Sequence, residues 1–394
     1  MLIIVAPGQG SQTPGFLAPW LEDPRFAERL GWLSAVAGLD LAHYGTEADA
    51  ETIRDTAVAQ PLLVGAGLVA ALSLFPHPGD AFARIGAVAG HSVGELTAAA
   101  GARAITAEQA MVLVRERGKA MAEAAAATPT GMTAVLGGDP EEVQAALTRH
   151  GLTAANVNAP GQLVAAGTTA QLAAFAESPP PKARLVPLSV AGAFHTEHMA
   201  PAVAQLGKLA RAVSTHDPRT TLISNADGKI VHDGRDVVRR IVTQIQKPVR
   251  WDLCLQTMTD LGVTGILEMP PAGTLTGIAK RALPGVETFA LKTPDQLDAA
   301  RDFADLHGSQ SSIDISPTWR LLVSPSKGTF VRQAGGEGEL LIPTSPVGTV
   351  RSSRDETPVV APHGGTIVEW LVEDGDLVSP GQPLVRLHPA GVST

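Results

Sequence analysis

Residues 86–96, GAVAGHSVGEL, join a short apolar run to an alanine-rich stretch with helical character. The run ends in the pattern Gly-x-Ser-x-Gly at Gly90, Ser92 and Gly94, which is typical of a nucleophile elbow between a strand and a helix. The two glycines let the backbone reverse direction, and the helix offers free N–H groups to a developing oxyanion. The stretch predicts an α/β fold with Ser92 as nucleophile, although five residues alone also fit an ordinary loop.

The composition indicates a large, acidic chain rich in small apolar residues. It has 394 residues, of which 44% are hydrophobic and 18% charged, and a net charge of −9. This length is sufficient for at least two domains, and the negative charge argues against a nucleic-acid partner. The single cysteine, Cys254, excludes an internal disulfide framework and fits a reducing compartment.

The N-terminal residues, MLIIVA, lack basic side chains and run directly into Pro7 and Gly8. This pattern predicts a buried parallel strand over residues 2–6 rather than a signal peptide. No apolar run reaches about 18 residues, so we expect no transmembrane span. The protein is therefore expected to be cytoplasmic.

The rest of the first 127 residues predicts helices around this strand. Residues 23–75 have a helical pattern with expected breaks at Gly38, Gly45 and Pro61, and an apolar helix is expected to begin at Gln60. A capping box at Thr106 predicts a long helix up to residue 126. Together with residues 193–305, where strand and helix patterns alternate again, this part is predicted to form a hydrolase-like parallel-sheet body.

Residues 128–192 have a different pattern. Strands are expected at 133–136, 153–157, 163–166 and 184–190, and helices at 140–149 and 169–177. The order strand–helix–strand–strand–helix–strand is that of a ferredoxin-like βαββαβ unit. We therefore expect a subdomain inserted into the α/β body.

The C-terminal part reads as a linker and a small all-β module. Residues 306–317 are polar and rich in glycine, serine and proline, which is typical of a linker. Residues 318–394 contain short β-type runs between Gly/Pro turns and no helical period.

A serine nucleophile needs a base, most often histidine. The chain has eleven histidines. His195 and His198 follow a small-residue turn at the expected domain junction, where clefts form. His91 adjoins Ser92 and is expected to point away from it. Six others lie in polar or turn stretches and are expected to be solvated, namely His43, His77, His150, His216, His232 and His307.

Over about residues 1–295 the chain resembles malonyl-CoA:acyl-carrier-protein transacylases, including the acyltransferase domains of polyketide synthases. Six motifs in family order carry the resemblance, namely GQGSQ at 8–12, GHSVGE at 90–95, RGKAM at 117–121, NVNAPGQ at 156–162, GAFH at 192–195 and PVRW at 248–251. One motif departs from the family: the usual turn Glu-x-Gly-Pro-Gly is replaced by EMPPAG at 268–273.

This resemblance implies a role for each matching residue. Ser92 is the acylated nucleophile and His195 its general base. The backbone N–H groups of Gln12 and Val93 form the oxyanion hole, and Arg117 binds the free carboxylate of the malonyl group. The backbone carbonyl of Gln244 orients His195. Four further residues are expected to bind substrate, namely His91, Asn158, Phe194 and Asn225.

The chemistry of Arg117 agrees with that implied role. A malonyl thioester carries a carboxylate into an apolar cleft, which is unfavourable unless the charge is paired. A guanidinium offers two parallel hydrogen bonds to such a group. Read without the resemblance, Arg117 also fits a solvated helix residue beside Arg115 and Glu116.

The tail resembles a biotinyl/lipoyl-type β-sandwich. Three stretches carry this resemblance, namely VSPSKGTF at 323–330, APHGGTI at 361–367 and VEDGDLVSPGQPL at 372–384. Such domains attach their cofactor to a lysine at a hairpin tip. Here the hairpin at 350–357 has no lysine, and none follows Lys327. We expect a degenerate module used for docking or stability, without biotin or lipoate.

The expected reaction transfers a malonyl group from malonyl-CoA to the phosphopantetheine thiol of an acyl carrier protein, in fatty-acid or polyketide synthesis. A malonyl-serine intermediate makes the scheme ping-pong. No bound cofactor or metal is expected. Two alternatives remain: a serine hydrolase or thioesterase that uses the same Ser92 and His195, and a non-catalytic scaffold built around the β tail.

Overall fold

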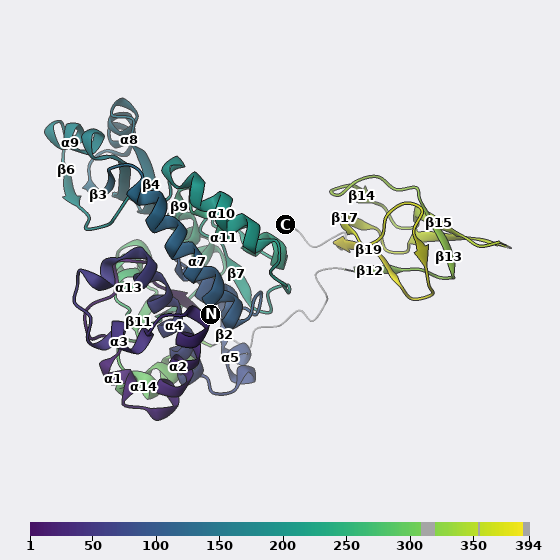
Figure 1. Ribbon diagram of the computed structural model, residues 1–394, viewed down its shortest axis with the longest axis horizontal. Coiled ribbons are helices and arrows are strands. Elements are labelled where there is room, and N and C mark those ends of the chain that lie inside the picture. Colours follow the sequence, from purple (N-terminus) through teal and green to yellow (C-terminus); the bar gives the residue numbers. More distant parts are fainter. Residues whose placement is uncertain (309–319, 354, 389–394) are drawn as a thin grey trace. The chain divides into compact units, whose positions relative to one another are not determined.

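The computed structural model describes residues 1–308, 320–353 and 355–388. The chain divides into two compact units, Met1–Ile313 and Asp314–Thr394 (Figure 1). In the described residues, the first unit mixes helices with two sheets, and the second contains strands without helices. The mixed α/β class and the all-β tail expected from the sequence are both present.

The central sheet of the first unit has six strands in the order β11-β10-β1-β2-β7-β8. The neighbours are parallel except β7 and β8. The strands are β1 (Leu2–Ala6), β2 (Ile85–Gly90), β7 (Thr221–Ile223), β8 (Ile230–Val231), β10 (Gly265–Glu268) and β11 (Glu287–Ala290). Strand β2 is buried throughout, as a central parallel strand covered on both faces should be.

Helices from both ends of the unit cover this sheet. Helices α4 and α7 pack against each other, and Figure 1 shows α7 as a long helix in front of the sheet. The N-terminal helical elements are α1 (Ala18–Leu21), α2 (Pro24–Ala37), α3 (Leu41–Thr46), η1 (Thr52–Arg54), α4 (Thr56–Leu74), α5 (Pro78–Arg84), α6 (Gly94–Gly101) and α7 (Ala107–Ala126). Thr106 forms the expected capping box of α7.

Helix α4 corrects two expectations from the sequence. It begins at Thr56 with Asp55 as N-cap and continues through Pro61, so the expected break at Pro61 and the start at Gln60 are wrong. Gly45 lies inside α3 rather than between helices. Burial along nearly the whole of α4 outweighs the one backbone hydrogen bond that proline removes.

Helix α4 is also long and apolar enough to cross a membrane, with 19 residues and a mean hydropathy of 1.9. The sequence analysis underestimated the length of this apolar segment, because Thr56 and Gln60 interrupt its apolar run. Within the protein 78% of its apolar window is buried. Such burial is typical of the core helix of a soluble fold.

The second sheet has the order β6-β3-β5-β4-β9. Its strands are β3 (Thr130–Gly137), β4 (Thr153–Ala159), β5 (Gln162–Thr168), β6 (Ala183–Pro187) and β9 (Val249–Arg250). Helices α8 (Pro140–Arg149) and α9 (Thr169–Glu177) lie with these strands in Figure 1. Because β9 pairs with β4, residues well beyond 192 complete this sheet.

The chain then returns to the central sheet. The remaining helical elements are η2 (Glu197–Met199), α10 (Ala200–Ala210), α11 (Gly234–Gln244), α12 (Trp251–Asp260), α13 (Thr274–Ala282), η3 (Pro294–Gln296) and α14 (Leu297–His307). The sequence analysis did not assign α10, β11 or α14. Helix α14 also corrects the expected linker, since its last residue, His307, is buried and contacts Thr264 and Glu287 rather than solvent. Residues 309–317 of that linker lie outside the described residues.

The second unit is a sandwich of two four-stranded sheets, β12-β19-β17-β14 and β16-β15-β13-β18. Its strands are β12 (Arg320–Val323), β13 (Gly328–Arg332), β14 (Leu340–Leu341), β15 (Ser345–Arg351), β16 (Glu356–Ala361), β17 (Gly365–Trp370), β18 (Leu377–Val378) and β19 (Pro383–His388). Its core gathers around Phe330, Val347 and Leu384. Strands β15 and β16 form the hairpin whose turn lacks lysine.

Candidate active site

Ser92 lies at a sharp turn between β2 and α6. Its backbone is in the left-handed region, with φ 54°, which is strained for a residue with a side chain. A Cβ on Gly90 would collide with the backbone of Gly94, and one on Gly94 would collide with the carbonyl of Ala6. Both glycines are therefore required for the close approach of β1, β2 and α6.

Three neighbouring strands end beside one another and bring distant residues together. Ala6 at the end of β1 is paired with Gly90 at the end of β2, so the loops after them, which hold Gln12 and Ser92, are adjacent. Asn225 follows the next strand, β7, and its side-chain carbonyl accepts a hydrogen bond from the Ser92 N–H at 2.9 Å. This is the carboxyl edge of a parallel sheet, where ligands bind in α/β folds.

His195 is in hydrogen-bonding contact with Ser92. Ser92 Oγ lies 2.8 Å from His195 Nε2, and His195 Nδ1 lies 2.8 Å from the carbonyl oxygen of Gln244. Since a carbonyl oxygen only accepts, Nδ1 carries the proton and Nε2 is free to take the serine proton. Burial lowers the pKa of His195 to about 3, with a further contribution from the charge of Arg117. The imidazole is therefore neutral at physiological pH.

The loop that carries His195 is fixed by its own hydrogen bonds. His195 has a left-handed backbone, with φ 62°. Its N–H donates to the carbonyl of Ile245 at 3.0 Å, and the N–H of Ala193 donates to Thr130 Oγ1 at 3.0 Å. These hydrogen bonds keep the backbone of His195 in its strained left-handed conformation, which is of a kind often found at active sites.

Arg117 comes from α7 and is 1% exposed. Its Nη2 donates to Ser92 Oγ at 3.2 Å, and its Nη1 to Gln60 Oε1 at 2.6 Å. In the described part of the chain its Nε has no hydrogen-bond partner, and no salt bridge joins it to a carboxylate. Burial lowers its pKa to about 10, and the charge of Glu95 opposes this shift.

Two polar residues that the sequence analysis did not identify support the site. Gln60 holds the guanidinium of Arg117. Glu95 Oε1 accepts the N–H of Asn225 at 2.8 Å, so it supports Ser92 indirectly. Burial raises the pKa of Glu95 to about 7. Each is a polar side chain in an otherwise apolar helical stretch, and that contrast was the available signal.

The site opens into a cleft of about 470 Å³ between the two sheets of the first unit. Ser92, His195, Phe194 and Asn158 are among its lining residues. Asn158 Oδ1 accepts a hydrogen bond from His91 Nε2 at 3.0 Å. His91 also lines the cleft, and burial lowers its pKa.

Asn225 does not line the cleft, contrary to the substrate-binding role expected for it. It is completely buried, and its carboxamide oxygen is used on the Ser92 backbone. It therefore holds the backbone of Ser92 in place.

Of the two residues expected to form the oxyanion hole, Val93 follows Ser92 directly, and Gln12 lines the same cleft. Val93 is the N-cap of α6. The N–H groups of Gly94, Glu95 and Leu96 donate to the carbonyl groups of His91, Ser92 and Val93, so the Val93 N–H is the candidate donor at this helix start. The side chain of Gln12 accepts from the Gly10 N–H and donates to the Ile53 carbonyl, which fixes its loop beside the elbow. The turn at 268–273, whose sequence differs from the usual family motif, is held by hydrogen bonds. The carboxylate of Glu268 accepts the N–H groups of Gly273, Leu275 and Thr276 at the start of α13.

This arrangement has the parts of an acyl-transfer site. A serine hydroxyl contacts a neutral imidazole whose orientation is set by a carbonyl group, and the Val93 N–H lies at a helix start. Within residues 1–308, 320–353 and 355–388, no group of three or more His, Cys, Asp or Glu side chains is placed to hold a metal ion. Cys254 is buried, and burial raises its pKa, which disfavours a thiolate nucleophile there.

Comparison with known proteins agrees with this geometry. Residues 3–308 match the family model described as "Acyl transferase domain". The malonyl CoA-acyl carrier protein transacylase of Mycobacterium tuberculosis strain H37Rv is 51% identical over 298 residues, which cover 76% of this chain and 98% of that protein. The Bacillus subtilis protein of the same name is 32% identical and covers 75% of this chain and 94% of its own length.

Solved structures that resemble this chain are also malonyl-transacylases. The crystal structure of MCAT from Mycobacterium tuberculosis matches with a TM-score of 0.74 and 50% identity, covering 76% of this chain and 99% of that one. A malonyl-transacylase in complex with its type II PKS acyl-carrier protein matches with a TM-score of 0.70 and 29% identity, with coverage of 76% and 99%. On the family match and the identity to curated relatives, the chain belongs to the acyl transferase family.

Proposed function

We propose that this chain transfers a malonyl group from malonyl-CoA to the phosphopantetheine thiol of an acyl carrier protein. One observation carries the choice of a malonyl substrate: the buried guanidinium of Arg117 lies 3.2 Å from the nucleophile and has no carboxylate partner among the described residues. A buried cation without a carboxylate in direct contact is costly. The free carboxylate of a malonyl group would supply that charge beside the reacting carbonyl.

The reaction runs in two half-reactions. As Ser92 Oγ attacks the thioester carbonyl, its proton passes to His195 Nε2, and the N–H groups of Val93 and Gln12 receive the oxyanion. The C–S bond breaks, and the CoA thiolate takes the proton from His195. The thiol of the carrier protein then attacks malonyl-Ser92 in the same way, with His195 again taking and returning the proton. His91, Asn158 and Phe194 shape the acyl cleft.

The similar proteins support an acyl carrier protein as the acceptor of the malonyl group and a role in a biosynthetic pathway that uses such a carrier. The curated relatives are transacylases of acyl carrier protein, and one structural neighbour was solved with a type II PKS carrier protein. We therefore infer a role in fatty-acid or polyketide synthesis with malonyl-CoA and a carrier protein as partners. The mostly buried α4 supports a soluble enzyme, and we propose the cytoplasm as its location.

A hydrolase that uses the same Ser92 and His195 is the alternative, and it differs in the acceptor. The test is a burst assay with malonyl-CoA, with and without holo-carrier protein. A transferase should release one equivalent of CoA, stop, and resume when holo-carrier protein is added. Continuous CoA release that yields free malonate without the carrier would identify a hydrolase.

We also propose the finer domain assignment. Residues 1–127 and 193–305 form a hydrolase-like body, and 128–192 a ferredoxin-like insert. The strand order β6-β3-β5-β4, in which each pair of neighbours is antiparallel, supports a ferredoxin-like insert. The body then extends to His307, where α14 ends.

The second unit is proposed to be a degenerate biotinyl/lipoyl-like module. Its two four-stranded sheets and the lysine-free turn between β15 and β16 support that reading. We expect a role in docking or stability rather than cofactor transport. The intact mass of the full chain tests this, because an increment of the size of biotin or lipoate would contradict it.

A further inference from the structure

A second cavity, of about 740 Å³, lies in the first unit. It is larger than the active-site cleft, and its lining includes neither Ser92 nor His195. Residues of helices α2, α4, α5 and α6, of strands β1 and β2 and of the segment before β7 line it on several sides. Its volume falls within the range of about 300–1,000 Å³ that is typical of small-molecule sites. The proposed malonyl transfer makes no use of this space.

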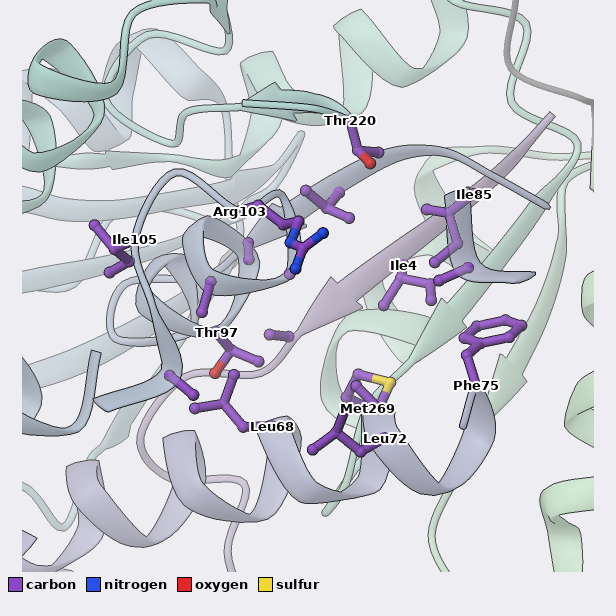
Figure 2. A pocket seen from close by; sticks show the side chains of 18 of the residues that line it. Ile4, Leu68, Leu72, Phe75, Ile85, Thr97, Arg103, Ile105, Thr220 and Met269 are labelled. Carbon is purple, nitrogen blue, oxygen red and sulfur yellow. The ribbon is translucent and has the colours of Figure 1, made fainter. Parts of the chain in front are cut away.

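Most of the wall is apolar. Figure 2 shows Leu68, Leu72, Phe75 and Ile85 around the space, with Ile4 and Met269 between them. Leu72 is 42% exposed and Trp32, which also lines the cavity, is 54% exposed, so the apolar wall reaches the solvent. Protein interiors rarely leave a space of this size unfilled. An apolar wall that is open to solvent in this way is typical of a site for an apolar ligand.

The charged groups of the cavity lining are arginines. Its lining includes Arg29, Arg103 and Arg219 but no aspartate or glutamate, and its other polar side chains are His216 and three threonines. Figure 2 shows the guanidinium of Arg103 directed toward the space between Thr220 and Ile4. In the part of the chain that the structure describes, no salt bridge neutralises any of the three arginines, and Arg103 lies over the ring of Phe82 at 5.8 Å.

An apolar chamber with an arginine-rich rim fits one chemical class of ligand. We propose that this cavity binds an unbranched acyl chain with an anionic head group, the chain against the α4 and α6 side and the head at Arg103 and Arg219. Burying the chain removes apolar surface from water, and a guanidinium binds a carboxylate or phosphate through charge-assisted hydrogen bonds. A free fatty acid and an acyl-CoA share this chemistry.

Isothermal titration calorimetry of the full chain tests the proposal. The probe is dodecanoate below its critical micelle concentration, with 1-dodecanol as the match that lacks the charge. We expect saturable binding of one dodecanoate per chain and at least about tenfold weaker binding of the alcohol. Dodecanoyl-CoA distinguishes the two sources: tighter binding than dodecanoate indicates a thioester ligand, and weaker binding a free acid.

Two variants locate the bound probe. Leu72→Trp fills the apolar wall and Arg103→Gln removes the cation, so each should weaken dodecanoate binding by about tenfold or more. Their matched controls are Leu306→Trp, at a leucine that is 71% exposed on α14, and Arg25→Gln, on the exposed start of α2; both should bind like the parent. Circular dichroism melts confirm that each variant is folded.

Three results would overturn the proposal. These are no saturable binding of either dodecanoate or dodecanoyl-CoA, binding that Leu72→Trp and Arg103→Gln leave unchanged, and equal affinity for dodecanoate and 1-dodecanol. Because the readout is binding rather than malonyl transfer, failure here leaves the proposed function standing, and failure of the proposed function leaves this site to be judged separately.

Discussion

Arg117 Nη2 and Ser92 Oγ are 3.2 Å apart, so the cation and the nucleophile of this site are in direct contact. The serine hydroxyl therefore accepts from Arg117 while it donates to His195. A substrate carboxylate bound at Arg117 would place its own carbonyl next to Ser92, because the two groups of a malonyl unit are separated by one carbon. We propose this contact as the physical basis for selecting a dicarboxylic acyl group.

The first prediction concerns this cation. Arg117→Ala should lose malonyl transfer by at least about 10²-fold, since a charge-assisted pair is worth about 1.5–3 kcal/mol and its loss also misplaces the acyl group. Acetyl transfer should be kept or raised, because acetyl has no carboxylate. Rates with malonyl-CoA and acetyl-CoA measure both, and Arg115→Ala on the same helix is the control. An equal fall with both substrates would make Arg117 a structural residue.

The second prediction concerns the protonation of His195. Its pKa of about 3 keeps the base neutral far below pH 6.5, so acylation of the enzyme should change little from pH 7.5 to 5.5. A histidine with an ordinary pKa would lose about tenfold over that range. Burial also raises the pKa of Glu95 to about 7, so its titration could change the acylation rate in the same pH range. The pH profile of acylation is therefore measured in Glu95→Gln as well, where this carboxyl group is absent. A limb near pH 6.5 in both proteins would contradict the prediction.

The same shift affects stability. Between pH 6.5 and 3 the unfolded chain binds a proton at His195 that the folded chain does not, so the free energy of unfolding should fall as the pH falls through this range. His195→Ala should reduce that fall and slow acylation by about 10²–10⁴-fold. His198→Ala, three residues away, serves as the control for both measurements.

The third prediction concerns acyl choice. Phe194 is buried and lines the cleft directly before the base, where its ring would occupy the space that an α-methyl group needs. Because one methyl group is worth only about 1–3 kcal/mol in such a pocket, preference for malonyl over methylmalonyl should be partial. The ratio of kcat/KM for the two CoA esters should fall in Phe194→Ser. Equal use of both esters by the parent protein would refute this role.

The fourth prediction concerns the elbow. Gly90→Ala places a Cβ against the backbone of Gly94, which cannot move without displacing Ser92. We expect the free energy of unfolding to fall by more than about 2 kcal/mol. Gly101→Ala at the end of α6 is the matched control, because its Cβ meets nothing within 4 Å. Equal melting temperatures for the two variants would show that the close approach at Gly90 tolerates a side chain.

Much of the architecture could be predicted from local signals. The apolar run before Ser92 and the capping box at Thr106 place β2 and α7 where the structure has them. Pro61 misled the prediction because a local helix breaker was weighed without the packing that buries α4. His307 misled it because a histidine next to a polar stretch gives no sign of the β10 and β11 surfaces that cover it.

The site was predictable where a motif carried it and less so where tertiary contacts assign the role. Ser92, His195 and the Gln244 carbonyl meet at hydrogen-bonding distance, as the family resemblance implied. Asn225 was assigned to substrate, but its side chain binds the Ser92 backbone, a contact between segments 133 positions apart. Gln60 was missed for the same reason, since its partner Arg117 is 57 positions away.

The most direct test of a malonyl-serine enzyme is mass spectrometry of the protein after incubation with malonyl-CoA and no carrier protein. We predict one malonyl increment per chain, located by peptide fragmentation on Ser92 and absent from Ser92→Ala. Addition of holo-carrier protein should then remove the increment from the enzyme and place it on the phosphopantetheine thiol. A malonyl group on any residue other than Ser92, or an undiminished increment in Ser92→Ala, would contradict the assignment.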